Sequence, residues 1–198
     1  MISGIECVTL GVRDLEAALR LFKDVFGFQV ESDTRASVSL LSVWGLRPYE
    51  DVRLVELSCD GYPFGRIRLA GVPAAEAHVT RDDFGPTARD RPTDAGPKAL
   101  DLYVAPPIDD AVRVLGTAGC PLRAPPVRFT IRETVTEEAL ATGPDHLPLL
   151  LMVGHRHPKR AQRAVPPAGC TSEVATVSVV AVSLKKTRRF SVDGPGLA

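Results

Sequence analysis

Residues 5–28 read IECVTLGVRDLEAALRLFKDVFGF, and this stretch decides the fold. Apolar residues alternate with small or polar ones over residues 7–12, which is the period of a strand with one buried face. Asp14 is of a type that caps helices, and apolar residues then recur at helical spacing over residues 15–26. Gly27 stands where a left-handed residue ends a helix, and alternation resumes directly after it. The stretch therefore predicts a strand, a capped helix, a glycine stop and a second strand.

The same arrangement returns twice along the chain. Residues 174–197 read VATVSVVAVSLKKTRRFSVDGPGL, and one gap-free offset aligns Leu184 with Leu15 and Gly196 with Gly27. A weaker copy, ALDLYVAPPIDDAVRVLGTAG, lies between these two stretches. Repetition of this kind fixes the architecture of a chain. It predicts an α+β fold with two βαβββ modules at residues 1–72 and 98–154, linkers at 73–97 and 155–171, and an incomplete third module at 172–198.

Within the modules, some elements are less regular. Residues 43–48 predict a turn of helix followed by a loop that begins at a proline. A strand is predicted over residues 121–131, and the pair Pro125-Pro126 restricts it to an edge or a bulge. Residues 52–58 and 65–69 alternate as strands around a strong Asp60-Gly61 turn signal, so we expect them to form a hairpin.

Composition excludes several classes of partner. The chain has 24 Lys and Arg against 24 Asp and Glu, so its net charge gives no reason to expect nucleic acid or an anionic membrane. No apolar run is long enough to cross a bilayer, and the N-terminus lacks the pattern of a signal peptide. The four cysteines are scattered without CxxC spacing, which favours a reduced, cytoplasmic protein.

Several motifs resemble a known superfamily. The strand IECVTL (5–10), the helix start DLE (14–16) and the ending GF (27–28) are similar to the opening of a vicinal oxygen chelate module. The segment GPDHLPL (143–149) is similar to the turn that opens the last strand of such a module. The superfamily includes glyoxalases, extradiol dioxygenases and bleomycin resistance proteins. The resemblance implies that two βαβββ modules pair so that eight strands form an open, barrel-like cleft.

The resemblance also implies where a metal would bind. Members that use a metal take a histidine from the first strand of a module and a glutamate from its last strand, and a divalent iron, manganese, zinc or nickel ion polarises the substrate. These positions carry other residues here: Cys7, Ala99 and Thr176 for the histidine, and Arg68 or Leu69 and Leu150 for the glutamate. Arginine repels a cation, and one thiolate is not a site. We therefore expect no metal cofactor; such an ion is expected only if this alignment of ligand positions is wrong.

Strand periodicity predicts which side chains face the cleft. In the first strand the apolar residues meet the helix, so the intervening residues face the concave side. The predicted pocket residues, of which the tryptophan would form the roof, are Cys7, Thr9, Trp44, Arg68, Asp101 and Tyr103. An arginine–aspartate pair beside a tyrosine hydroxyl can bind a polar or anionic small molecule. The alternatives are that Arg68 and Asp101 form a structural ion pair, and that Trp44 only packs against the core.

Two further residues also have two interpretations each. Cys7 is a reactive thiol if Arg68 lowers its pKa, and otherwise an inert buried cysteine. Glu56 is a general base if it is buried, and otherwise a strand residue that faces water.

The third module raises the question of a partner. Residues 174–182 form a long apolar strand without the strands that would complete a module, and an exposed edge invites pairing with another chain. The chain is then the front part of a longer protein, or it forms a homodimer by strand exchange through residues 172–198. Two functions remain open: metal-free binding of a small organic molecule in the cleft, or the non-catalytic half of a longer glyoxalase- or extradiol-dioxygenase-like metalloenzyme. The sequence does not decide whether this chain is an enzyme. If it is one, the resemblance implies a glyoxalase- or dioxygenase-like lyase or oxidoreductase.

Overall fold

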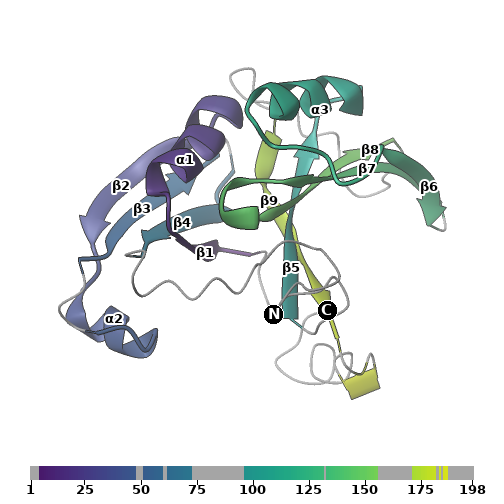
Figure 1. Cartoon of the computed structure of the whole chain (residues 1–198). Helices are drawn as coiled ribbons and strands as arrows, with labels where there is room; N and C mark the ends of the chain where they lie inside the picture. The colour runs from purple at the N-terminus through teal and green to yellow at the C-terminus, as the bar shows by residue number, and fades with distance from the viewer. Residues whose placement is uncertain are drawn as a thin grey trace.

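The structure, a computed structural model, describes residues 5–47, 51–59, 62–72, 96–131, 133–155, 171–181, 183 and 185–186. These residues form an α+β fold with a four-stranded sheet and a five-stranded sheet, which lie side by side in Figure 1 and do not close into a barrel. No described helix has the length and apolar character needed to cross a membrane.

The first sheet is built by a βαβββ unit, as predicted. Its elements are β1 (Cys7–Val12), α1 (Leu15–Leu19), η1 (Arg20–Val25), β2 (Gln29–Arg35), α2 (Val38–Val43), β3 (Arg53–Ser58) and β4 (Arg66–Gly71). The strand order is β1-β4-β3-β2, with β1 parallel to β4 and the other pairs antiparallel, so the predicted β3–β4 hairpin is confirmed. Asp14 caps α1 by accepting a hydrogen bond from the Ala17 amide at 2.8 Å. Gly27 ends the helix with φ 83°, and the second half of that helix, η1, is π-helical.

The second sheet repeats this order. Its elements are β5 (Gly96–Val104), α3 (Ile108–Thr117), β6 (Val127–Ile131), β7 (Thr134–Thr142), the short η2 (Pro144–His146), β8 (Pro148–Gly154) and β9 (Thr171–Val180). β5 runs parallel to β8 as β1 does to β4, which confirms the internal repeat. β6 begins only after Pro125-Pro126, later than the predicted strand, because proline cannot donate to a ladder.

The segment expected to start a third module instead extends the second sheet. β9 pairs antiparallel with β5, giving the strand order β6-β7-β8-β5-β9, and its amide at Val174 also donates to the Gly65 carbonyl of the first module at 3.1 Å. The expectation that this strand lacks a partner within the chain is therefore wrong for residues 171–180. Their backbone groups find partners in β5, which a local pattern cannot specify.

One hydrophobic core joins the helix-bearing faces of the two sheets. Phe22 lies at its centre, with its ring edge-on to Phe26 at 5.8 Å and to Phe28 at 6.0 Å between centroids. Residues of the second sheet, such as Leu102 and Leu149, belong to the same buried cluster. α1 and α3 both lie along the upper side of the molecule in Figure 1. The opposite face of the first sheet therefore carries polar side chains, except where a smaller apolar cluster covers it.

A smaller cluster forms where α2 packs on that opposite face. Ser37 caps the start of α2, and its hydroxyl accepts a hydrogen bond from the Leu40 amide at 3.3 Å. Leu41 is buried against Leu54 and Ala70 of the sheet. The helical turn expected at residues 43–48 thus lies earlier in the chain, where Leu41 is the helix residue that is buried in the apolar patch.

Candidate functional site

The face of the first sheet that points away from α1 carries a row of polar side chains. Strand register places Thr9 beside Arg68, Arg68 beside Glu56, and Glu56 beside Ser32. The alternating residues on the other face, such as Ile67 and Leu69, are fully buried in the core. The row therefore crosses all four strands at one level of the sheet.

Glu56 is the centre of an ion-pair cluster in this row. Its two oxygens accept from Arg68 Nη2 at 2.9 Å and from Arg66 Nη1 at 3.1 Å. Arg66 also reaches Glu6 at 3.1 Å, but Glu6 is largely exposed. The Glu56 side chain is only 17% exposed, so this carboxylate is tolerated because two guanidinium groups surround it. Its hydrogen bond raises the pKa of Arg68, which stays charged.

A hollow of about 300 Å³ opens where this row meets α2. Arg68 and Glu56 lie at one side of it, and residues of β2 and of the start of α2 lie at the other. The full lining is Ser32, Thr34, Arg35, Ser37, Leu40, Leu54, Glu56 and Arg68. The hollow thus combines two guanidinium groups, one carboxylate, three hydroxyls and two leucines.

Cys7 lies near this cluster without becoming a reactive thiol. Burial raises the pKa of the Cys7 thiol, and this effect outweighs the opposing field of Arg68. Of the two interpretations of Cys7, the structure favours the inert one, because the thiolate is the reactive form. The other predicted pocket residue of this strand, Thr9, is exposed on the same face beside Arg68.

Asp101 does not pair with Arg68. Asp101 is only 5% exposed. Its carboxylate accepts hydrogen bonds from Thr176 at 2.5 Å and from Ser178 at 2.9 Å, both on β9. Burial raises the pKa of Asp101 despite these hydroxyls, and burial together with the Asp101 charge raises the pKa of Glu138. The predicted ion pair between Arg68 and Asp101 is therefore wrong. Each of the two residues has its partners within its own sheet.

Tyr103 and Trp44 lie apart from the hollow. The Tyr103 amide donates to Ser172 at 3.2 Å, and its ring lies beside Gly154. Trp44 packs, half-buried, against the small cluster beneath α2. Of the six predicted pocket residues, the structure thus places only Arg68 in the lining of the hollow.

Four polar residues of this lining were not predicted from the sequence. Ser32, Thr34 and Arg35 lie on β2 and Ser37 caps α2. Alternation predicted the strand β2 but did not indicate which of its side chains border the hollow, because the strand is exposed on both faces. Glu56 was a candidate from the sequence, as a buried general base or a strand residue that faces water, but the structure shows it mostly buried and paired with Arg66 and Arg68.

The residues present do not fit the divalent ion that the fold implies. In the first module the first-strand position holds the single thiol of Cys7, which is not a site by itself, and the last-strand position holds the Arg68 guanidinium, which repels a cation. In the ranges that the structure describes, no three His, Cys, Asp or Glu side chains gather in a way that could hold a metal ion.

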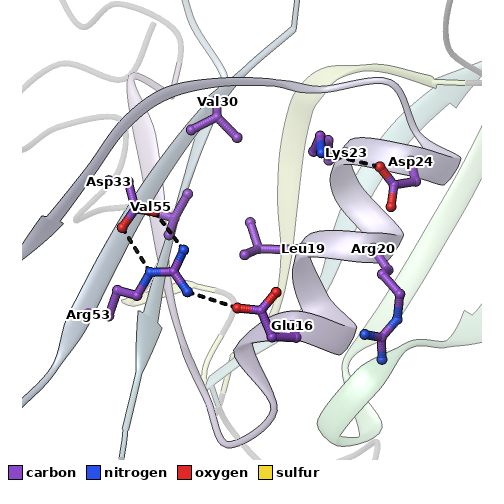
Figure 2. Close-up of a pocket in the computed structure, with 9 residues that line it drawn as sticks. All are labelled: Glu16, Leu19, Arg20, Lys23, Asp24, Val30, Asp33, Arg53 and Val55. Atoms are coloured by element: carbon purple, nitrogen blue, oxygen red, sulfur yellow. Dashed lines mark hydrogen bonds and ion pairs between the residues drawn. The ribbon is translucent and has the colours of Figure 1, made fainter.

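A second hollow, of about 250 Å³, lies on the helix-bearing side between α1, η1 and strands β2 and β3 (Figure 2). Its central group is Arg53, which donates to Asp33 at 2.6 and 2.8 Å and to Glu16 at 2.8 Å. The side chain of Arg20 points away from this pair in Figure 2. The Asp33 and Glu16 carboxylates already pair with the single positive charge of Arg53. The Arg53 guanidinium therefore has less capacity to bind an anionic ligand than Arg68 has in the first hollow.

Comparison with known proteins supports the fold. No protein-family model matches the chain, and no curated protein matches it significantly. Among solved structures, a glyoxalase family protein from Bacillus cereus has a TM-score of 0.60 at 15% identity, covering 78% of this chain and 95% of that one. The glyoxalase family protein from Enterococcus faecalis has a TM-score of 0.52 at 14% identity, covering 77% and 98%. At these identities the likeness is one of fold.

Proposed function

We propose that this chain, which has the fold of the vicinal oxygen chelate superfamily, binds a small organic molecule without a metal ion. The binding site is the hollow between α2 and the polar face of the first sheet. The observation that carries the proposal is Arg68, a charged group at the wall of this hollow whose neighbours include hydroxyls and leucines.

The dimensions of the hollow suit a small ligand. Ligand pockets measure roughly 300–1,000 Å³ and combine apolar walls with a few polar groups that orient the ligand. At about 300 Å³, the hollow lies at the lower end of this range. Leu40 and Leu54 supply apolar wall, while Ser32 and Thr34 supply hydroxyls. The ligand is therefore a compact molecule with both kinds of surface.

The chemistry of the face supports binding without a metal. Lewis-acid catalysis requires an ion held by several anionic or neutral donors. Here the last-strand position of the first module presents the cation Arg68, with Arg66 on the same face of β4, and guanidinium groups bind anions directly. The role that an ion plays in polarising substrate oxygens would pass to guanidinium N–H groups in this chain.

The test measures metal and ligand binding on the same purified chain. The metal content of the purified chain is measured first. Titrations with Fe²⁺, Mn²⁺, Zn²⁺ and Ni²⁺ are then monitored by calorimetry, and a small-molecule library is screened by thermal shift. We expect no tight, stoichiometric metal binding, and ligands whose stabilising effect is lost in Arg68→Gln. Tight binding of one metal ion per chain would overturn the proposal and favour the metalloenzyme alternative.

A further inference from the structure

We infer that the ligand of this hollow is a monocarboxylate whose carboxylate binds Arg68; the inference rests on the proposed function and names the class of ligand. Arg68 has hydrogen-bond donors that its described neighbours do not use. A guanidinium has five N–H donors, and Arg68 gives one nitrogen, Nη2, to Glu56. Among the residues that the structure describes, its other N–H groups have no partner. The side chain is 34% exposed, and it borders the hollow.

The charges around the hollow favour one negative charge. Arg66 and Arg68 converge on the single carboxylate of Glu56, so the half-buried part of the cluster carries one more positive than negative charge. The pair between Arg66 and Glu6 compensates little, because Glu6 is 74% exposed and solvent screens such pairs. Arg35 is an exposed residue that pairs with Asp51. A ligand with one negative charge therefore completes the balance at Arg68.

The shape of the free donors favours a carboxylate. A planar guanidinium binds a carboxylate through two parallel N–H···O bonds, which fixes the orientation of the ligand. A phosphate monoester carries nearly two negative charges and would lie against the Glu56 carboxylate, which repels it. A monocarboxylate meets less repulsion there and uses the same donors.

The opposite wall defines the rest of the ligand. The Ser32 and Thr34 hydroxyls have no hydrogen-bond partner among the described residues, and both border the hollow. Leu40 of α2 and Leu54, which is on the same strand as Glu56, add apolar surface to the lining. A carboxylate that also bears a hydroxyl or carbonyl oxygen on a short hydrocarbon skeleton matches Arg68, the hydroxyls and the leucines at the same time.

The test compares acids with their uncharged amides. The probes are lactate and lactamide, 2-hydroxy-4-methylpentanoate and its amide, and 4-hydroxybenzoate and 4-hydroxybenzamide, with glycerol phosphate as the dianion. Affinities are measured by calorimetry or by ligand-observed NMR at low ionic strength. At least one acid should bind about tenfold or more tightly than its amide, because a hydrogen bond from a guanidinium to an ionised acceptor is stronger than one to a neutral acceptor. That preference should disappear in Arg68→Gln and persist in the control Arg20→Gln, which removes the same charge from an exposed residue beside the other hollow.

A second variant changes affinity in the opposite direction. Glu56→Gln removes the carboxylate that shares Arg68, so acids should bind severalfold more tightly, whereas a merely destabilised protein would bind more weakly. An acid preference that survives Arg68→Gln, or glycerol phosphate binding more tightly than every acid, would overturn the inference. If the amides bind the hollow as tightly as the acids do, the inference is overturned but the proposed function still stands. No binding of any probe, together with no hit in the wider library, would overturn both.

Discussion

Replacement of Gly65 by alanine tests the placement of β9 against the first sheet. Gly65 has φ 72°, its amide donates to the Ile5 carbonyl at 2.6 Å, and its carbonyl accepts from Val174 of β9 at 3.1 Å. An added Cβ would lie 2.6 Å from the Val174 carbonyl oxygen and 2.6 Å from Glu173 Cγ. The Val174 carbonyl oxygen belongs to the backbone and cannot rotate away as the end of a flexible side chain does, so the whole strand β9 must shift.

The expected cost has two parts. A non-glycine residue in the left-handed region costs about 1 kcal/mol. Forcing extra volume into a packed site costs about 1–3 kcal/mol more. Gly65→Ala should therefore lower the free energy of unfolding by about 2–4 kcal/mol. Gly45→Ala is the matched control, because Gly45 has φ 71° but no neighbouring atom within 4 Å of the added Cβ. Its expected cost is the conformational part alone.

The assay is urea-induced unfolding followed by circular dichroism, with hydrogen exchange read at residues 171–180. Gly65→Ala should lose exchange protection in this segment, whereas Gly45→Ala should keep it. The placement of β9 over Gly65 would be refuted if the free energies of unfolding of the two variants differ by less than about 0.5 kcal/mol and both variants retain exchange protection at residues 171–180.

Three further predictions concern stability. The folded-state pKa values of Asp101 and Glu138 are raised, so the folded chain binds more protons than the unfolded one, and stability should fall as pH rises above about 4 in urea titrations. Asp101→Asn should flatten that decline, and an unchanged slope would refute it. Burial raises the pKa of Asp145, but its bonds to Arg13 outweigh this and keep the pKa low, so Asp145→Asn should cost about 1–2 kcal/mol at pH 7 and progressively less as pH falls below about 4. Phe22→Ala should cost about 3–5 kcal/mol by thermal or urea unfolding; a loss below 1 kcal/mol would contradict the core.

Local elements followed closely from sequence patterns. Asp14 caps α1 and Gly27 takes a left-handed conformation because both roles depend on the backbone within a few residues. The polar face of β4 followed from alternation alone, since Arg66 and Arg68 flank the buried Ile67. The repeat of βαβββ units followed from the recurrence of these same patterns.

Partner choice was harder to predict. The expected pair of Arg68 with Asp101 required the two sheets to meet at these residues, whereas the register of β3 with β4 brings Glu56 beside Arg68 first. α2 formed earlier than expected because Leu41 reaches Leu54 and Ala70, which are distant in sequence. Each miss concerns a contact between segments rather than a segment itself.

The amino-acid sequence therefore specifies the strands, the helix ends, the repeated unit and the face on which charges lie, because these depend on periods of two and 3.6 residues along one stretch of backbone. The folded chain decides which charges meet. It pairs Glu56 with two arginines, gives Asp101 the hydroxyls of β9, and places β2 and α2 around Arg68 to form the hollow. Those outcomes depend on strand register and on packing between distant segments, which no local pattern encodes.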